Sequence, residues 1–369
     1  MTSSLSSADL RAKLLERARS PSVESVFLRA ARRETTDYTP VWFMRQAGRI
    51  LPEYRQLRER WSLMEICRDP ELCAEVTLQP LRRMPLDAAV LFADIMLPLV
   101  GIGVELDLVD DVGPVIRRPI RDEPGIAALR AIQPQEDVPH VLETIKLVKA
   151  EIAPRAVIGF AGGPFTLASY LIEGRPSRDF ARTKALMFGA PTLWHELMRR
   201  LASIMGEYLL AQIRAGVDVV QLFDSWVGAL DVDDYVVFVQ PYTRAIFAAT
   251  APTGVPSIHF GTNTAMLLDE MKGDGASIIG VDWRVPLDHA WERVGFDLGI
   301  QGNLDPGALL GSADVMERKA ADVLRRAGGR PGHIFNLGHG LLPTTPLENA
   351  MRLVDFVHER TAACEGAVA

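Results

Sequence analysis

The segment Pro40-Val41-Trp42-Phe43-Met44-Arg45-Gln46-Ala47-Gly48-Arg49 joins a short apolar run directly to a group of arginines. A continuous apolar run such as 41–44 is typical of a buried strand in a parallel sheet. A guanidinium is always charged, and its planar fork of donors suits a carboxylate or a phosphate. The segment therefore predicts a pocket for an anion with a large apolar body. The alternative is a solvated basic loop, or arginines paired with Glu53 and Glu59.

Seven further apolar runs follow along the chain, at 88–92, 156–160, 217–223, 255–260, 276–281, 297–302 and 333–337. Amphipathic helical patterns lie between them, for example at 138–152, 192–215 and 234–250. Strands that alternate with helices predict parallel βαβ units. Eight such units predict an α/β fold, a single-domain (β/α)8 TIM barrel that spans residues 1–369. The alternative is an open doubly wound sheet, which usually carries a Gly-rich turn after its first strand, and none follows 41–44.

Residues 101–135 fit this alternation poorly. Extended pieces at 101–106 and 115–117 flank a turn at 110–114, which predicts an elaborated loop after the second strand. The two ends of the chain, 1–20 and 361–369, are expected to be flexible.

The composition and net charge of the chain disfavour a nucleic-acid-binding, membrane-spanning or secreted protein. With 48% hydrophobic and 24% charged residues the chain is typical of a soluble globular protein, and its net charge of −7 disfavours nucleic acid as a partner. No apolar run approaches the length of a membrane span, and residues 1–8 lack the basic and apolar regions of a signal peptide. Cys67, Cys73 and Cys364 have no metal-like spacing, so we expect reduced thiols and a cytoplasmic location.

Polar side chains follow several of the predicted strands. In barrels of this kind, active sites form at the carboxyl ends of the strands, so these side chains should meet at one rim. The candidates are Arg45, Arg49, Asp94, Tyr170, Ser225 and His339.

Each candidate also has a purely structural interpretation. Asp94 is a lone carboxylate between apolar residues, costly to bury unless it is paired or used, but it could cap a helix or pair with an arginine. His339 lies between two glycines, where a ligand can approach the backbone, but it could be a turn histidine. Tyr170 could be a core residue, and Ser225 could cap the next helix.

Several ordered segments of the chain resemble the uroporphyrinogen decarboxylase family, from about residue 22 to 355. They are Arg45-Gln46-Ala47-Gly48-Arg49 with Pro52-Glu53-Tyr54-Arg55, then Gly159-Phe160-Ala161-Gly162-Gly163-Pro164-Phe165-Thr166-Leu167-Ala168-Ser169-Tyr170, and shorter blocks at 92–95, 223–226 and 336–340. Ala93 and Met96 stand where the family often has Ser and Leu. The resemblance implies a homodimeric single-domain barrel with no cofactor or metal. It also implies that the substrate is uroporphyrinogen III, whose four acetate arms become methyls with loss of four CO2, giving coproporphyrinogen III.

The implied reaction needs an electron sink, because loss of CO2 from a pyrrole acetate would leave a carbanion-like centre. Protonation of the pyrrole ring makes such a sink within the substrate itself, so neither PLP nor a metal is needed. The resemblance places Asp94 beneath the pyrrole N–H groups as the stabiliser of the protonated ring, and Arg45 on the reacting acetate. The other implied substrate-binding residues are Gln46, Ala47, Arg49, Tyr170, Ser225 and His339. The general acid, the order of the four arms, isomer preference and rates do not follow from the sequence.

Three other functions compete with this one. A zinc-dependent corrinoid methyltransferase resembles this family, but it would need a His-x-Cys pair where the chain reads His259-Phe260-Gly261. A phosphate-binding barrel enzyme that uses Gly338-His339-Gly340 explains neither the early arginines nor Asp94. A non-catalytic tetrapyrrole carrier would keep the arginines and apolar wall without requiring Asp94, and a turnover measurement separates it.

Overall fold

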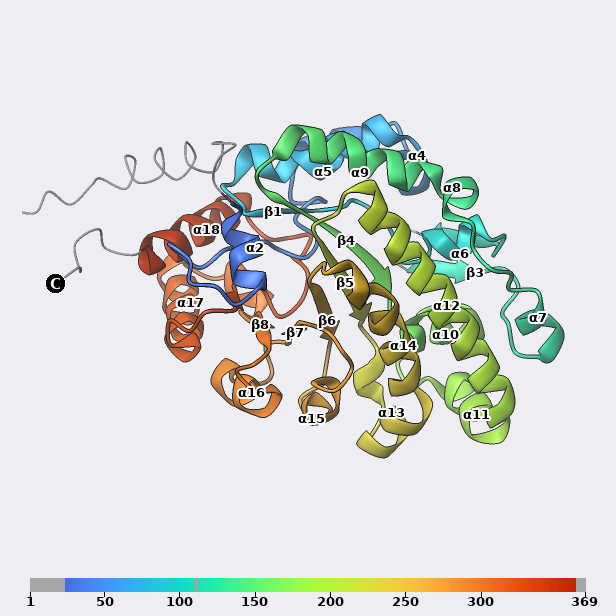
Figure 1. The fold of residues 1–369 in the computed structure, drawn as a ribbon. Coiled ribbons are helices and arrows are strands. Elements are labelled where there is room, and N and C mark those ends of the chain that lie inside the picture. The colour runs from blue at the N-terminus through green and yellow to red at the C-terminus, as the bar shows by residue number, and fades with distance from the viewer. Residues whose placement is uncertain (1–23, 110–111, 363–369) are drawn as a thin grey trace, which may run out of the picture.

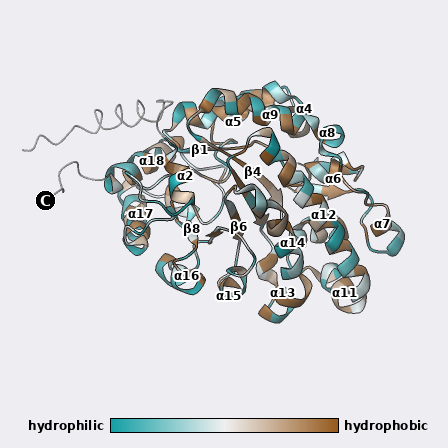
Figure 2. Ribbon diagram, viewed as in Figure 1, coloured by the Kyte–Doolittle hydropathy of each residue, from teal (hydrophilic) through white to brown (hydrophobic). Residues whose placement is uncertain are grey.

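The computed structural model describes residues 24–109 and 112–362, and its centre is a curled parallel sheet. Seven strands pair in the order β1-β4-β5-β6-β7-β8-β9. They are β1 (Ala88–Val90), β4 (Ala156–Gly162), β5 (Val219–Asp224), β6 (Ser257–Gly261), β7 (Ile278–Gly280), β8 (Gly299–Gln301) and β9 (His333–Ile334). Figure 1 shows the helices arranged around these strands. In Figure 2 the apolar colours are concentrated towards the strands and the polar colours towards the outside of the helices.

Val41 alone fills the eighth position of the ring. It forms an isolated parallel bridge with Phe335, just after β9, and its carbonyl accepts the Asp87 N–H at 3.0 Å, just before β1. The sheet is therefore closed as in a TIM barrel, which confirms the predicted fold. The predicted strand at 41–44 is wrong in length, because the chain turns away where the Gln46 N–H donates to the Phe43 carbonyl at 3.1 Å.

A buried carboxylate, that of Asp87, fastens this closing seam. It accepts hydrogen bonds from the Tyr38 hydroxyl at 2.9 Å and from the Val41 N–H at 2.7 Å. His358, on the last helix, contacts the same carboxylate through Nε2 at 2.8 Å. One side chain thus joins the amino-terminal segment, the start of β1 and the carboxyl-terminal helix.

Local sequence signals mark some of the ends of the helices that cover the sheet. For example, Asp69 accepts the Leu72 N–H at 2.9 Å and Pro70 begins the helix that follows, whereas Gly216, with φ +117°, ends another. These helices are α5 (Pro70–Arg83), α9 (Pro139–Ile152), α10 (Pro164–Glu173), α12 (Pro191–Ala215), α14 (Gln240–Thr250), α16 (Leu287–Val294), α17 (Ala313–Ala327) and α18 (Leu347–Thr361).

Further helices lie in the connections between these elements. They are α2 (Val26–Ala31), α3 (Pro52–Arg58), α4 (Leu63–Arg68), α11 (Ala181–Gly189), α13 (Val232–Phe238), α15 (Leu268–Met271) and the 3₁₀ helices η1 (Val227–Ala229), η2 (Ala251–Thr253) and η3 (Pro306–Leu310). The helices predicted at 138–152 and 192–215 are confirmed as α9 and α12. The prediction of one helix at 234–250 is wrong, because α13 ends at Phe238 and α14 begins at Gln240. Pro241 has no N–H with which to continue a helical ladder, so it starts a new helix instead.

The elaborated loop after the second strand position is confirmed. It contains α6 (Leu97–Gly101), the antiparallel pair β2 (Leu106–Val109) and β3 (Gly113–Ile116), α7 (Glu123–Ala127) and α8 (Pro134–Asp137). The extended piece expected at 101–106 lies instead at β2, because Gly101 still belongs to α6. Of the flexible ends expected at 1–20 and 361–369, residues 1–20 and 363–369 lie outside the described residues, whereas Thr361 still belongs to α18. Among the helices of the described part, none is both long and apolar enough to cross a membrane.

Candidate active site

The predicted site residues lie on loops or helices that follow the carboxyl ends of the barrel strands. Asp94 follows β1, and Tyr170 lies on α10 after β4. Ser225 follows β5 and His339 follows β9, while Arg45 follows the Val41 bridge. In a parallel barrel these ends share one rim. The charges of Arg45 and Asp94 both affect the pKa of Tyr170, so these three side chains lie within reach of one another's charge.

Arg45 has a constrained backbone and an exposed side chain. Its φ of +62° lies in the left-handed region, which a residue with a Cβ rarely adopts. Its side chain packs against Gly340 so closely that a Cβ on Gly340 would lie 2.5 Å from Arg45 Cδ. The Arg45 side chain therefore lies against the loop after β9, and a Cβ at residue 340 would force it to shift.

Gln46 and Ala47 lie beneath this loop and are buried. Gln46 Oε1 accepts the Phe43 N–H at 3.0 Å, and Nε2 donates to the Ala88 carbonyl at 3.0 Å. The amide of Gln46 thus ties the arginine loop to β1, a connection that the sequence pattern did not reveal. Because backbone groups occupy both ends of this amide, its contribution to a substrate site comes through the shape of the loop.

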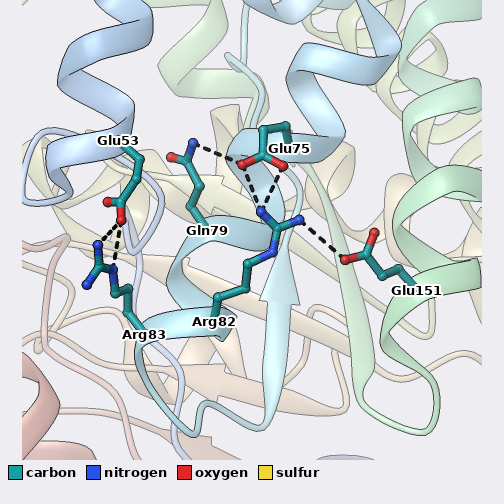
Figure 3. A network of polar contacts seen from close by, with 6 residues as sticks. All are labelled: Glu53, Glu75, Gln79, Arg82, Arg83 and Glu151. Carbon is teal, nitrogen blue, oxygen red and sulfur yellow. Dashed lines mark hydrogen bonds and ion pairs between the residues drawn. The ribbon is translucent and has the colours of Figure 1, made fainter.

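Arg55 and Glu53, which follow this loop in the chain, hold it in place through hydrogen bonds and an ion pair. Arg55 Nη1 donates to the Arg49 carbonyl at 2.8 Å and the Ile50 carbonyl at 3.3 Å. Glu53 pairs with Arg83 of α5, whose Nε donates to Glu53 Oε1 at 2.8 Å, as Figure 3 shows. Glu53 therefore pairs with an arginine of α5 at the surface. It is one of the two glutamates that the sequence allows as partners for the arginines of the loop.

The surface beside Glu53 is held by further ion pairs. Arg82 bridges Glu75, at 2.8 Å, and Glu151, at 3.3 Å, and so joins α5 to α9 (Figure 3). These groups are largely exposed, so each pair contributes little to stability.

Asp94 is held by the loop after β1. Its Oδ1 accepts the Met96 N–H at 2.8 Å. Burial raises the pKa of Asp94, and the Met96 N–H and the charge of Arg45 oppose that rise. The loop is fixed on α5, because the Phe92 N–H donates to Thr77 Oγ1 at 3.0 Å and Cys73 Sγ donates to the Phe92 carbonyl at 2.8 Å. A carboxylate in such surroundings is suited to binding a partner that brings its own positive charge.

Aromatic side chains form an apolar wall near Tyr170. The rings of Tyr170 and Trp226 are 4.1 Å apart between centroids, and Phe223 packs against Phe160 at 5.3 Å and Phe260 at 6.0 Å. Burial and the charge of Asp94 raise the pKa of Tyr170, so its hydroxyl keeps its proton and can donate.

Buried Asp224 connects the loops after β4 and β5. It accepts hydrogen bonds from Thr166 Oγ1 at 2.8 Å and the Thr166 N–H at 3.3 Å, and Trp226 N–H donates to the same Oγ1 at 3.2 Å. A Cβ on Gly163 would lie 2.4 Å from Asp224 Cγ. The segment 159–170, which resembles the family, therefore needs a glycine at 163, and its contacts with Asp224 and Trp226 hold the loop that carries half-buried Ser225.

His339 is partly buried and electrically neutral over a wide pH range. The Gly340 N–H donates to Nδ1 at 2.7 Å, so in the neutral ring the proton lies on Nε2. Burial, followed by the charges of Arg45 and Arg284, lowers the pKa of His339 to about 4, although Asp282 opposes this shift. His339 is therefore a hydrogen-bond donor through Nε2 and carries no charge at neutral pH.

Sequence reasoning missed a group at the end of β7. Asp282, Trp283 and Arg284 follow that strand, and the Trp283 ring meets the His339 ring edge-on at 6.5 Å. The signal for them is the apolar run at 276–281, which Asp282 follows directly.

A prediction follows from the packing of Arg45. We expect Gly340→Ala to fold but to lose most turnover, because the added Cβ would displace the Arg45 side chain. Gly189→Ala is the matched control, since a Cβ there meets nothing within 4 Å. Steady-state turnover and melting temperature measured on both variants check this expectation. Wild-type turnover in Gly340→Ala would mean that the direction of Arg45 is unimportant.

A second prediction concerns pH. The pKa of His339 is lowered to about 4 from 6.5, so the unfolded chain binds the proton first as the pH falls. The stability that neutral His339 contributes is complete above pH 6.5 and is lost as the pH falls towards about 4. An NMR titration, with the His339 resonance identified by its absence in His339→Gln, should give a pKa near 4. Titration near 6.5 would contradict the buried, arginine-flanked setting.

The described cysteines are free thiols and form no metal-binding cluster with other side chains. Cys67 and Cys73 are buried and free, and Cys364 lies outside the described residues. Within residues 24–109 and 112–362, no group of three or more His, Cys, Asp or Glu side chains is arranged to hold a metal ion.

The chain matches a family model described as uroporphyrinogen decarboxylase (URO-D) over residues 23–360. Among its relatives, a protein named uroporphyrinogen decarboxylase from Thermobifida fusca (strain YX) is 55% identical, over 92% of this chain and 94% of the relative. Another of that name, from Sorangium cellulosum (strain So ce56), is 53% identical over 90% of this chain and 95% of the relative.

Among solved structures, a methyltransferase from Methanosarcina mazei superposes with a TM-score of 0.77 at 21% identity, and covers 91% of this chain and 98% of its own. At that identity the likeness shows the fold alone.

Proposed function

Because the chain belongs to the uroporphyrinogen decarboxylase family, it is a decarboxylase that acts on a tetrapyrrole, and we propose that Arg45, Asp94 and Tyr170 form its reaction centre. The observation that carries the proposal is the setting of Asp94. It is a carboxylate fixed by the Met96 N–H, within the electrostatic reach of Arg45 and Tyr170. The aromatic wall beside it suits the apolar body of a porphyrinogen.

The reaction converts uroporphyrinogen III into coproporphyrinogen III and four CO2. For each acetate, a proton first adds to the pyrrole carbon adjacent to the one that bears the arm. The bond between the methylene and the carboxylate then breaks, CO2 leaves, and its electron pair enters the cationic ring. A second proton converts the methylene into a methyl while the ring loses the first. Because the substrate supplies the electron sink, we propose that the reaction proceeds without a cofactor.

Asp94 stabilises the cationic ring in this proposal. A carboxylate accepts hydrogen bonds only, so it suits the convergent pyrrole N–H groups of the macrocycle. Its charge acts most strongly when the ring becomes positive, and a fixed charge of this kind lowers the barrier without reorganisation during the reaction. Burial raises the pKa of Asp94, and a cationic ring beside the carboxylate would oppose that rise, as the charge of Arg45 already does.

Arg45 holds the reacting acetate in a bidentate contact, and its side chain lies against Gly340. Arg49 and His339 bind other carboxylate arms, and the hydroxyls of Tyr170 and Ser225 donate to acetates. Gln46 and Ala47 shape the loop that presents Arg45. The identity of the general acid is left open in this proposal.

Two other functions are not favoured. In a zinc-dependent methyltransferase a Cys would follow the histidine of β6 by two positions, whereas here Gly261 does. His259 itself is fully buried and lies 3.1 Å from Asp274 through Nδ1. A non-catalytic tetrapyrrole carrier would have no use for the fixed carboxylate of Asp94.

We also propose a single domain over residues 1–369, a homodimer and a cytoplasmic location. The family resemblance supports the first two, and the free, buried Cys67 and Cys73 support a reducing compartment. Sedimentation equilibrium of the purified chain tests the dimer.

Anaerobic incubation with uroporphyrinogen III, after exhaustive chelation and without PLP, thiamine or flavin, tests the function. Separation of the products by carboxylate number should show the stepwise loss of carboxylates down to the four-carboxylate product. An unchanged carboxylate number would refute the proposal. Activity that returns only on addition of zinc would refute the cofactor-free reaction and favour the methyltransferase chemistry.

A further inference from the structure

The loop after β7 presents an arginine whose backbone is firmly held. Asp282, with its side chain 1% exposed, accepts the Arg284 N–H at 2.9 Å through Oδ1. Its Oδ2 accepts the Asn263 N–H at 2.6 Å and Arg284 Nη1 at 2.7 Å. The Arg284 side chain is nevertheless 45% exposed, and Asp282 engages one of the three guanidinium nitrogens. The buried carboxylate thus anchors a guanidinium that faces the solvent.

The position of this guanidinium is next to His339. It stacks over the Trp283 ring with Cζ 3.9 Å from the centroid, and that ring contacts the His339 ring. The loops after β7 and β9 also touch through their backbones, because a Cβ on Gly338 would lie 2.2 Å from the Trp283 nitrogen. Close packing of the two loops and the stacked ring leave Arg284 little freedom relative to the imidazole.

Charge at this part of the rim comes from arginines. Neutral His339 offers a hydrogen bond but no charge, and a carboxylate that leaves water needs a positive partner. Arg45 packs against Gly340 on one side of the imidazole, and Arg284 lies beside Trp283. Both guanidiniums act on His339, since both lower its pKa.

We propose that Arg284 is a further substrate-binding residue, whose guanidinium binds a carboxylate arm of the tetrapyrrole other than the one that is reacting. This inference rests on the proposed function and extends it from Arg45 and His339 to the loop after β7. A half-exposed arginine at the rim suits an arm that points out of the barrel, away from the reacting ring at Asp94. Trp283 supports the planar guanidinium by stacking, which orients its fork towards the arm.

The competing interpretation is that Arg284 serves only to neutralise buried Asp282. Loss of the charge would then lower the melting temperature and leave the affinity for substrate unchanged. Stability alone cannot separate the two interpretations, because both predict a less stable Arg284→Gln. The deciding measurement is affinity.

The experiment compares Arg284→Gln, Arg284→Lys and the control Arg352→Gln with the wild type, all as full chains under anaerobic conditions. Arg352 pairs with Glu317 on the outer helices and is similarly exposed, so it reports the generic effect of losing a paired arginine. Arg284→Gln should raise KM for uroporphyrinogen III roughly tenfold or more, as expected for loss of a charge-assisted hydrogen bond, with kcat within about threefold of wild type. Added salt should narrow this gap, and Arg352→Gln should behave as wild type.

Binding of coproporphyrinogen III, followed by tryptophan fluorescence, identifies the arm. This product carries propionates and no acetates, so weaker binding to Arg284→Gln means that the arm is a propionate. An effect seen with uroporphyrinogen but absent with coproporphyrinogen means that it is an acetate. Either result supports the inference.

Arg284→Lys keeps Asp282 neutralised and should fold even if the Gln variant does not. Its KM should rise less than that of Arg284→Gln, because the charge remains while the planar fork is lost. The inference would be overturned if KM stayed within about twofold of wild type in Arg284→Lys and, where it folds, in Arg284→Gln. The two proposals can fail separately. If the wild type binds coproporphyrinogen more tightly than Arg284→Gln does, but releases no CO2 from uroporphyrinogen III, the proposed function is refuted and this inference stands.

Discussion

Asp94→Asn is expected to lose turnover by roughly a hundredfold to a thousandfold, the range typical of removing one preorganised electrostatic stabiliser. The amide oxygen can still accept the Met96 N–H, so the loop should keep its shape. The negative charge is lost, however, and the amide presents donors where the pyrrole N–H groups need acceptors. Asp94→Glu keeps the charge but displaces it, and should retain intermediate activity, since a shift of about 1 Å can cost on the order of a hundredfold.

The same variant makes a prediction for stability. Burial raises the pKa of Asp94 above 3.8, so between pH 3.8 and the raised pKa the native state binds a proton more readily than the unfolded chain. The stabilising effect of the protonated form is complete below about pH 3.8 and is lost as the pH rises through the raised pKa. Above that range Asp94→Asn should melt at or above the wild-type temperature, and the difference should shrink in acid. An active but destabilised Asn variant would remove Asp94 from the mechanism.

Arg45→Lys is expected to reduce turnover by on the order of a hundredfold or more, because the ammonium keeps the charge but cannot hold the reacting acetate in two parallel hydrogen bonds. Arg49→Lys should mainly raise KM. The measurement is kcat and KM on the same preparations. Near-wild-type turnover in Arg45→Lys would reduce Arg45 to a general electrostatic contributor.

Arg45→Gly supplies a control for folding. A residue with a Cβ at φ +62° carries strain of about 1 kcal/mol, which glycine relieves. The glycine variant should therefore be at least as stable as the wild type while it has lost the guanidinium. A stable and inactive Arg45→Gly would show that activity resides in the side chain and that the loop survives without it.

The sequence predicts the barrel well where its signal is local. The run at 156–160 is apolar throughout and the run at 217–223 mostly so, and they become β4 and β5. The run at 41–44 has a similar composition, yet it forms a bridge at Val41 alone, because the turn after it depends on Gln46 binding Ala88. That contact joins residues far apart in the chain, and no window of sequence contains it. The break before α14 is different, since Pro241 is a local signal that outweighs the helical periodicity around it.

The site is predictable to the extent that it lies at strand ends. Asp94, Tyr170 and His339 all come shortly after an apolar run, and Arg284 does so too. The electrical state of His339 is not predictable in this way, because it results from burial and from arginines of two other loops. The packing of Arg45 against Gly340 is likewise invisible in the sequence, since it depends on the closed ring.

The seam at Asp87 has a consequence for synthesis on the ribosome. Its carboxylate must meet His358, which lies 271 residues later in the chain. At about 5–20 residues per second, tens of seconds separate the emergence of these two partners. For most of that interval the segments that carry Arg45 and Asp94 are already made, but His339 and β9 are not. The nascent chain therefore cannot complete its rim until the segment that carries His339 has emerged.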